Sequence, residues 1–110
     1  MTTSPRRYIG LDVHNEYLVA AAVDKRQNLL MPPQRVNYSN LADWIKLELQ
    51  STDTVVLEAC SNAWTIHDQL EPHLAQVTVA HAAHVKLIAS SLIKTDKRDA
   101  LALARLLAVT

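Results

Sequence analysis

Short apolar runs separated by polar turns fill the first third of the chain. Residues 8–13 (YIGLDV), 17–24 (YLVAAAVD) and 29–36 (LLMPPQRV) each have the length and the apolar content of a buried strand. The polar connection over residues 13–16 predicts a hairpin, so we expect the first two strands to be antiparallel. Because Pro32 and Pro33 cannot donate ladder hydrogen bonds, the third strand is expected at a sheet edge or with an irregularity.

Helical and strand patterns alternate after residue 36. Ser39 is a predicted helix N-cap, and apolar residues follow it at Leu41, Trp44, Ile45, Leu47 and Leu49. Residues 54–59 and 76–80 predict two further strands, with a helix over residues 63–70 between them. Helices over residues 82–90 and 95–109 complete the pattern. The order βββαβαβ followed by helices predicts an α/β fold with a mixed five-stranded sheet, whose later strands pair in parallel.

The last predicted helix is apolar around most of its circumference, since Arg105 is the one polar side chain between Ala100 and Val109. Such a helix needs cover on more than one side. The 110 residues have the length of one domain. We therefore expect the chain to be the N-terminal part of a longer polypeptide, or to associate through this helix.

Composition removes several classes of function. Gly10 is the one glycine, so a Walker loop and a dinucleotide fingerprint are both excluded within this chain. Cys60 cannot form an internal disulfide, and its apolar neighbourhood predicts a buried thiol in a reducing compartment. There is no secretory signal and no apolar run of about 18 residues, so a soluble cytoplasmic protein is expected.

The net charge of zero hides an asymmetry. Residues 1–72 carry six basic and nine acidic side chains, whereas residues 73–110 carry five basic and two acidic ones. Lys94, Lys97 and Arg98 stand beside two acids, where they are suited to contact the phosphates of DNA. The alternative is a solvated helix face.

Four carboxylates stand out by position. Asp12 lies among apolar neighbours within the first strand, Glu58 ends the fourth strand, and the i,i+3 spacing of Asp96 and Asp99 puts both on one helix face. If the first and fourth strands are neighbours, the four acids can gather at one edge of the sheet, where they would repel one another without a divalent cation. Oxygen ligands favour Mg²⁺ or Mn²⁺, and such ions serve phosphodiester chemistry. Taken singly, each acid can also be a surface or turn residue.

Three strings carrying these acids resemble a known family: YIGLDVHNEYLVAAAVD, VVLEACSNAW and KTDKRDALALARLL. They are similar to the N-terminal DEDD domain of the bacterial insertion-sequence transposases that include the Piv DNA invertase. The likeness extends from Tyr8 to Leu107, and its most specific part is K-T-D-x-x-D-A. The chain departs from the family after Glu58, where the usual glycine is missing, and at residues 81–84 (HAAH), which replace an Asn-Pro segment.

The resemblance implies a RuvC-like, ribonuclease H-like fold over residues 1–110, truncated before a C-terminal domain that supplies a serine nucleophile. It implies that Asp12, Glu58, Asp96 and Asp99 form the catalytic, metal-binding tetrad. It also implies homo-oligomers acting on DNA, in some members with a structured guide RNA encoded by the element.

The leading hypothesis is a DNA transposase or site-specific recombinase with Mg²⁺-dependent strand cleavage and transfer, nearly inactive as this fragment alone. Two alternatives remain open: a Holliday-junction-type nuclease that uses water as nucleophile, and a non-catalytic oligomerisation module or transposase remnant.

Other residues carry weaker signals. His81 and His84 lack further metal ligands, and Trp44 and Trp64 are expected in the core.

Overall fold

The computed structural model describes residues 6–80 and 100–109. Among these residues the strands are β1 (Tyr8–Val13), β2 (Tyr17–Val23), β3 (Leu29–Asn37), β4 (Thr54–Glu58) and β5 (Gln76–Ala80). The helices are α1 (Leu41–Glu48), α2 (Ala63–Leu70) and α4 (Ala100–Ala108), with 3₁₀ turns at Tyr38–Asn40 and Glu71–His73. The helix predicted over residues 82–90 and the first turn of the one predicted over 95–109 lie outside the described residues.

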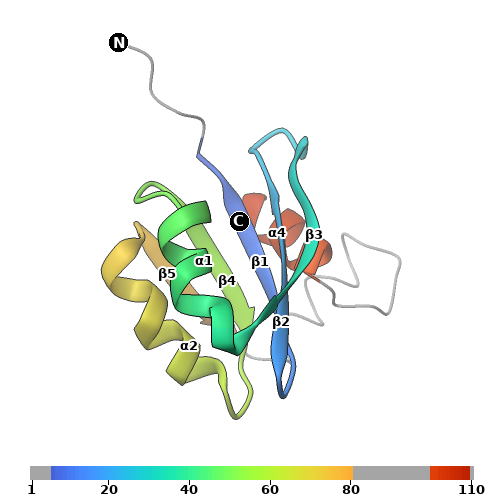
Figure 1. The fold of residues 1–110 in the computed structure, drawn as a ribbon. Coiled ribbons are helices and arrows are strands. Elements are labelled where there is room, and N and C mark those ends of the chain that lie inside the picture. The colour runs from blue at the N-terminus through green and yellow to red at the C-terminus, as the bar shows by residue number, and fades with distance from the viewer. Residues whose placement is uncertain (1–5, 81–99, 110) are drawn as a thin grey trace.

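The strands form one mixed five-stranded sheet in the order β3-β2-β1-β4-β5 (Figure 1). β1, β2 and β3 are an antiparallel meander, while β4 pairs in parallel with β1 and β5 in parallel with β4. The helical connections α1 and α2 return the chain to the end of the sheet at which β1 begins. The strands that follow them, β4 and β5, therefore run parallel to β1. The predicted α/β class, the mixed sheet and the element order are confirmed.

β3 lies at a sheet edge, as its two prolines predict. Pro32 and Pro33 are exposed, and the β2–β3 register shifts between Ala20 and Val23. Backbone nitrogens of successive strand residues point to opposite sides, so the free side of the edge strand accommodates one of the two prolines and the register shift accommodates the other.

Helices cover both faces of the sheet (Figure 1). α1 and α2 pack on one face over a core that contains Ile9, Leu11, Val55 and Leu57. α4 packs on the other face, where Val56 contacts Leu103 and Leu106. The molecule is therefore a three-layer α/β arrangement in which alternate residues of β1 and β4 face opposite layers.

α4 lies very close to β1 because β1 has a glycine at its centre. A Cβ atom at Gly10 would lie 2.5 Å from the backbone nitrogen of Ala104 and would also meet the carbonyl oxygen of Ala100. Further along the helix, Ala108 belongs to a buried cluster with Val23 and Tyr8, which pair at the start of β1. α4 thus runs antiparallel to β1, and its amino end points toward the half of β1 that carries Asp12.

Five residues of the apolar helix are buried: Ala100, Leu103, Ala104, Leu106 and Ala108. Leu101, Ala102 and Leu107 are half-buried, and Val109 is 54% exposed. Small alanine side chains let the helix approach the strands closely, as at Gly10. None of the described helices is long and apolar enough to cross a membrane.

Four residue-level expectations were wrong. Trp64 is 60% exposed because the buried stripe of α2 runs through Ala63, Ile66 and Leu70, one helical position away from it. Leu47 is 81% exposed on α1, and Cys60 is exposed in the turn after β4. Ser39 lies inside a 3₁₀ turn, so the N-cap of α1 is Asn40, which makes no side-chain capping bond. Trp44, by contrast, is buried as predicted.

Candidate functional site

Asp12 and Glu58 lie at the same end of two neighbouring parallel strands. Leu11 pairs with Leu57 in the β1–β4 register, and the two acids are the next residue on each strand. Leu11 and Leu57 both face the core under α1 and α2, so alternation turns Asp12 and Glu58 toward the opposite face, where α4 packs. The predicted pairing of the first and fourth strands is confirmed, and it places Asp12 and Glu58 at the same end of neighbouring strands.

The other predicted site residues, Asp96 and Asp99 with Lys94, Lys97 and Arg98, lie outside the described residues. The nearest described residue to them is Ala100, which follows Asp99 directly in the chain and packs against Gly10. Gly10 is two residues before Asp12 on the same face of β1. α4 therefore begins on the acidic face of the sheet, beside the strand that carries Asp12.

Asp12 has a side-chain partner that sequence reasoning missed. The Nε2 atom of His14 lies 3.1 Å from the Asp12 Oδ2 atom, and the two side chains are 42% and 30% exposed. The His14 ring stacks on Tyr17 with a centroid distance of 4.7 Å. With Nε2 protonated, His14 donates to one carboxylate oxygen and leaves the other open. The signal in the sequence was the i,i+2 spacing, which puts both residues on one side of an extended chain.

The described carboxylates provide part of the donor set that the expected cation needs. In the described ranges 6–80 and 100–109, no three His, Cys, Asp or Glu side chains gather to hold one metal ion. Asp12 and Glu58 provide carboxylate oxygens, which hard cations such as Mg²⁺ and Mn²⁺ prefer. The two acids fit such a cation in kind, and Asp96 and Asp99 would have to complete the set.

A pocket of about 220 Å³ opens near the same end of the sheet, on the side of α1 and α2. It is lined by Asn15, Tyr38, Leu41, Asn62, Thr65, Ile66 and Gln69. The Tyr38 hydroxyl donates to the His14 carbonyl oxygen over 2.5 Å, and partial burial raises the pKa of Tyr38. His14 thus contacts Asp12 through its ring and the pocket wall through its backbone. Sequence reasoning missed this pocket, because its lining comes from three separate segments.

The basic residue Arg35 lies on the acidic face as well. Arg35 pairs with Val19, and Val19 pairs with Asp12, so the three residues form one row across β3, β2 and β1. Directly paired residues point to the same face of a sheet. Sequence reasoning did not single out Arg35, since only the strand register brings it into line with Asp12.

Searches of protein-family models and of curated proteins find no match to this chain.

Proposed function

We propose that this chain is the metal-binding part of a DNA transposase or site-specific recombinase that breaks and joins phosphodiester bonds. The observation that carries the proposal is the placement of Asp12 and Glu58 at adjacent ends of β1 and β4, on the face where α4 begins. The family resemblance of the three acid-bearing strings points to the same chemistry.

The proposed fold is ribonuclease H-like, of the RuvC type. An antiparallel meander followed by two parallel strands, with helices on both faces, agrees with the architecture that the resemblance implies. In this assignment Asp12 lies on the central strand β1, which is hydrogen-bonded to a neighbouring strand on each side.

The carboxylates of this chain would hold the cation and orient the substrate. Asp12 and Glu58, joined by Asp96 and Asp99, would supply oxygen ligands, and His14 would fix the orientation of the Asp12 carboxylate. A bound Mg²⁺ or Mn²⁺ supplies charge stabilisation at the phosphate oxygens during in-line displacement. The resemblance assigns the nucleophile to a serine of a C-terminal domain.

Partners follow from the same proposal. Lys94, Lys97 and Arg98 stand beside two of the acids in the chain and would contact DNA phosphates. Assembly into a homo-oligomer and use of a structured guide RNA are further properties that the resemblance suggests.

Cation binding tests the assignment directly. We expect the 110-residue chain to bind Mn²⁺ in a titration followed by electron paramagnetic resonance. Asp12→Asn and Glu58→Gln are each expected to weaken binding about tenfold or more, because each removes a charged oxygen ligand. The control is Asp43→Asn, which removes an exposed acid from α1 on the opposite face of the sheet and should leave the affinity unchanged.

Equal Mn²⁺ affinity for the wild-type chain and both site variants would refute the assignment. In a polypeptide that also carries the serine-bearing domain, Asp12→Asn should abolish recombination of a DNA substrate. Recombination at the wild-type rate would contradict the proposal independently of the metal titration.

A further inference from the structure

Arg35 lies at a defined distance from the acidic pair. It is two strands away from Asp12 along the row that passes through Val19. Neighbouring strands are about 4.8 Å apart, so the backbones of Arg35 and Asp12 are separated by about 10 Å. Measured along the axis of duplex DNA, where each nucleotide of one strand advances by about 3.4 Å, this separation corresponds to about three nucleotides.

The Arg35 side chain is held in place although it is exposed. Its guanidinium carbon lies 3.8 Å from the centroid of the Tyr17 ring, and its Nε donates to the Asn37 side-chain oxygen over 3.2 Å. Tyr17 itself stacks on His14, the residue that contacts Asp12. A continuous set of contacts therefore connects the guanidinium to the candidate metal ligand.

This arrangement leaves the outer part of the guanidinium open. Within the described part of the chain, no carboxylate forms an ion pair with Arg35, and its two terminal nitrogens donate no hydrogen bond. A planar guanidinium with free paired N–H groups is matched to phosphate oxygens, which it binds in a bidentate manner. Holding it beforehand lowers the entropy lost on binding.

We propose that Arg35, held by Tyr17 and Asn37, binds a backbone phosphate of the DNA strand whose reacting phosphate lies at Asp12 and Glu58. The inference rests on the proposed function for the location of the reacting phosphate. It assigns a substrate-positioning role to β2 and β3, apart from the acidic residues and from the basic residues that precede α4.

Equilibrium binding of a short fluorescein-labelled duplex DNA, followed by anisotropy at several salt concentrations, tests the proposal. We expect Arg35→Gln to weaken binding about tenfold, to the same extent for unrelated DNA sequences. The slope of log affinity against log salt should fall by about 0.9, the value for one phosphate contact. Arg35→Lys should keep the slope but bind less tightly than wild type, since an ammonium cannot form the bidentate contact.

The matched control is Arg26→Gln, which removes an exposed arginine from the turn at the other end of β2. This variant should bind DNA like the wild-type chain. Tyr17→Leu removes the ring under the guanidinium and should weaken binding with the salt slope unchanged. Thermal melting followed by circular dichroism checks that each variant is folded.

Wild-type affinity and slope for Arg35→Gln would overturn the inference, as would equal losses for Arg35→Gln and Arg26→Gln. A loss seen with an RNA duplex of the same sequence and not with DNA would also overturn it. The Mn²⁺ titration of Asp12→Asn is independent of this result. An unchanged Mn²⁺ affinity together with an Arg35-dependent DNA affinity would refute the proposed function and retain the phosphate site.

Discussion

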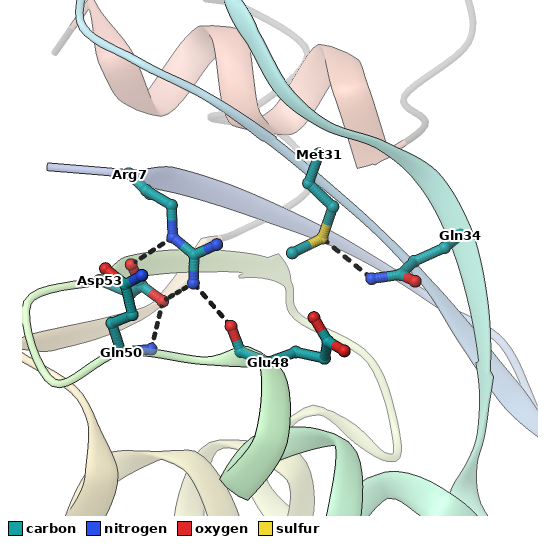
Figure 2. Close-up of polar contacts among 6 residues, drawn as sticks. All are labelled: Arg7, Met31, Gln34, Glu48, Gln50 and Asp53. Carbon is teal, nitrogen blue, oxygen red and sulfur yellow. Dashed lines mark hydrogen bonds and ion pairs between the residues drawn. The ribbon is translucent and has the colours of Figure 1, made fainter. Parts of the chain in front are cut away.

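Arg7 and Asp53 form a buried ion pair that ties the start of β1 to the turn before β4 (Figure 2). The Arg7 Nε and Nη2 atoms lie 2.8 and 2.6 Å from the two carboxylate oxygens of Asp53, which is fully buried. Nη2 also donates to the Glu48 carbonyl, and the Gln50 amide donates to Asp53. The hydrogen bond to Asp53 is the main reason that the pKa of Arg7 is raised. The buried Asp53 carboxylate therefore has both a counter-charge, from Arg7, and a backbone hydrogen bond, from the Gln50 amide.

Asp53→Asn should destabilise the fold by about 3 kcal/mol, because it leaves the Arg7 guanidinium without its counter-charge in a part-buried place. Urea unfolding followed by circular dichroism measures the change. The exposed acid Asp43 provides the comparison, since Asp43→Asn should change the free energy of unfolding by less than about 0.5 kcal/mol. Similar unfolding midpoints for the two variants would show that the ion pair contributes little.

Asp24 organises the turn between β2 and β3. Its carboxylate accepts hydrogen bonds from the backbone amides of Asn28 and Arg26, both over 2.9 Å, and these bonds lower the pKa of Asp24, with Asn28 first in importance. The turn also holds Gln27 at a φ of 71°. The charged carboxylate accepts these bonds better than a neutral group does.

Asp24→Asn should therefore show a pH-dependent effect. Because the folded pKa is below the ordinary value of 3.8, the stabilisation is present above that pH and is lost as the pH falls through the folded pKa. The difference in free energy of unfolding between wild type and variant should be constant from about pH 5 to 7. It should shrink below about pH 4, where the Asp24 carboxylate of the wild type becomes protonated. Guanidinium unfolding across this range measures it. A difference that stays constant down to pH 2 would contradict the prediction.

At the scale of elements, the strand and helix limits followed closely from the sequence. β1, α2 and β5 have the predicted bounds, and β2, β3 and β4 differ from them by one residue at their carboxyl ends. Short apolar runs bounded by polar turns define such strands well, because a buried strand needs both faces apolar. Helix caps were predicted less well, since the 3₁₀ turn at Tyr38–Asn40 depends on tertiary contacts such as the Tyr38 hydroxyl bond.

Gly10→Ala tests the contact between α4 and β1. An added methyl group would lie 2.8 Å from the Leu103 Cβ atom and closer still to the helix backbone, which cannot rotate away as a side chain can. We expect a loss of about 2 kcal/mol in unfolding free energy. Hydrogen exchange should show faster exchange of the α4 amides, with the α1 and α2 amides less affected. Unchanged protection of the α4 amides from exchange would show that the helix does not depend on close contact with Gly10.

At the scale of the whole molecule, the candidate site depends on the order of the strands in the sheet. Asp12 and Glu58 are 46 positions apart in the chain, and they become neighbours only because β4 pairs in parallel with β1. Arg35 joins them on the same face through two antiparallel registers. Shifting any of these registers by one residue would turn a member of the row to the other face.

The sequence by itself determined the elements, the α/β class, the edge position of the proline-bearing strand and the identity of the acidic residues. These features depend on local periodicity and on chemistry that individual side chains carry. Only the tertiary structure decided that His14 contacts Asp12, that Arg35 stands in line with it, that Asp53 is a buried ion-pair partner and that Trp64 faces outward. Such features depend on strand register and on the angle at which each helix meets the sheet, which are set by packing between distant segments and leave little trace in the local pattern.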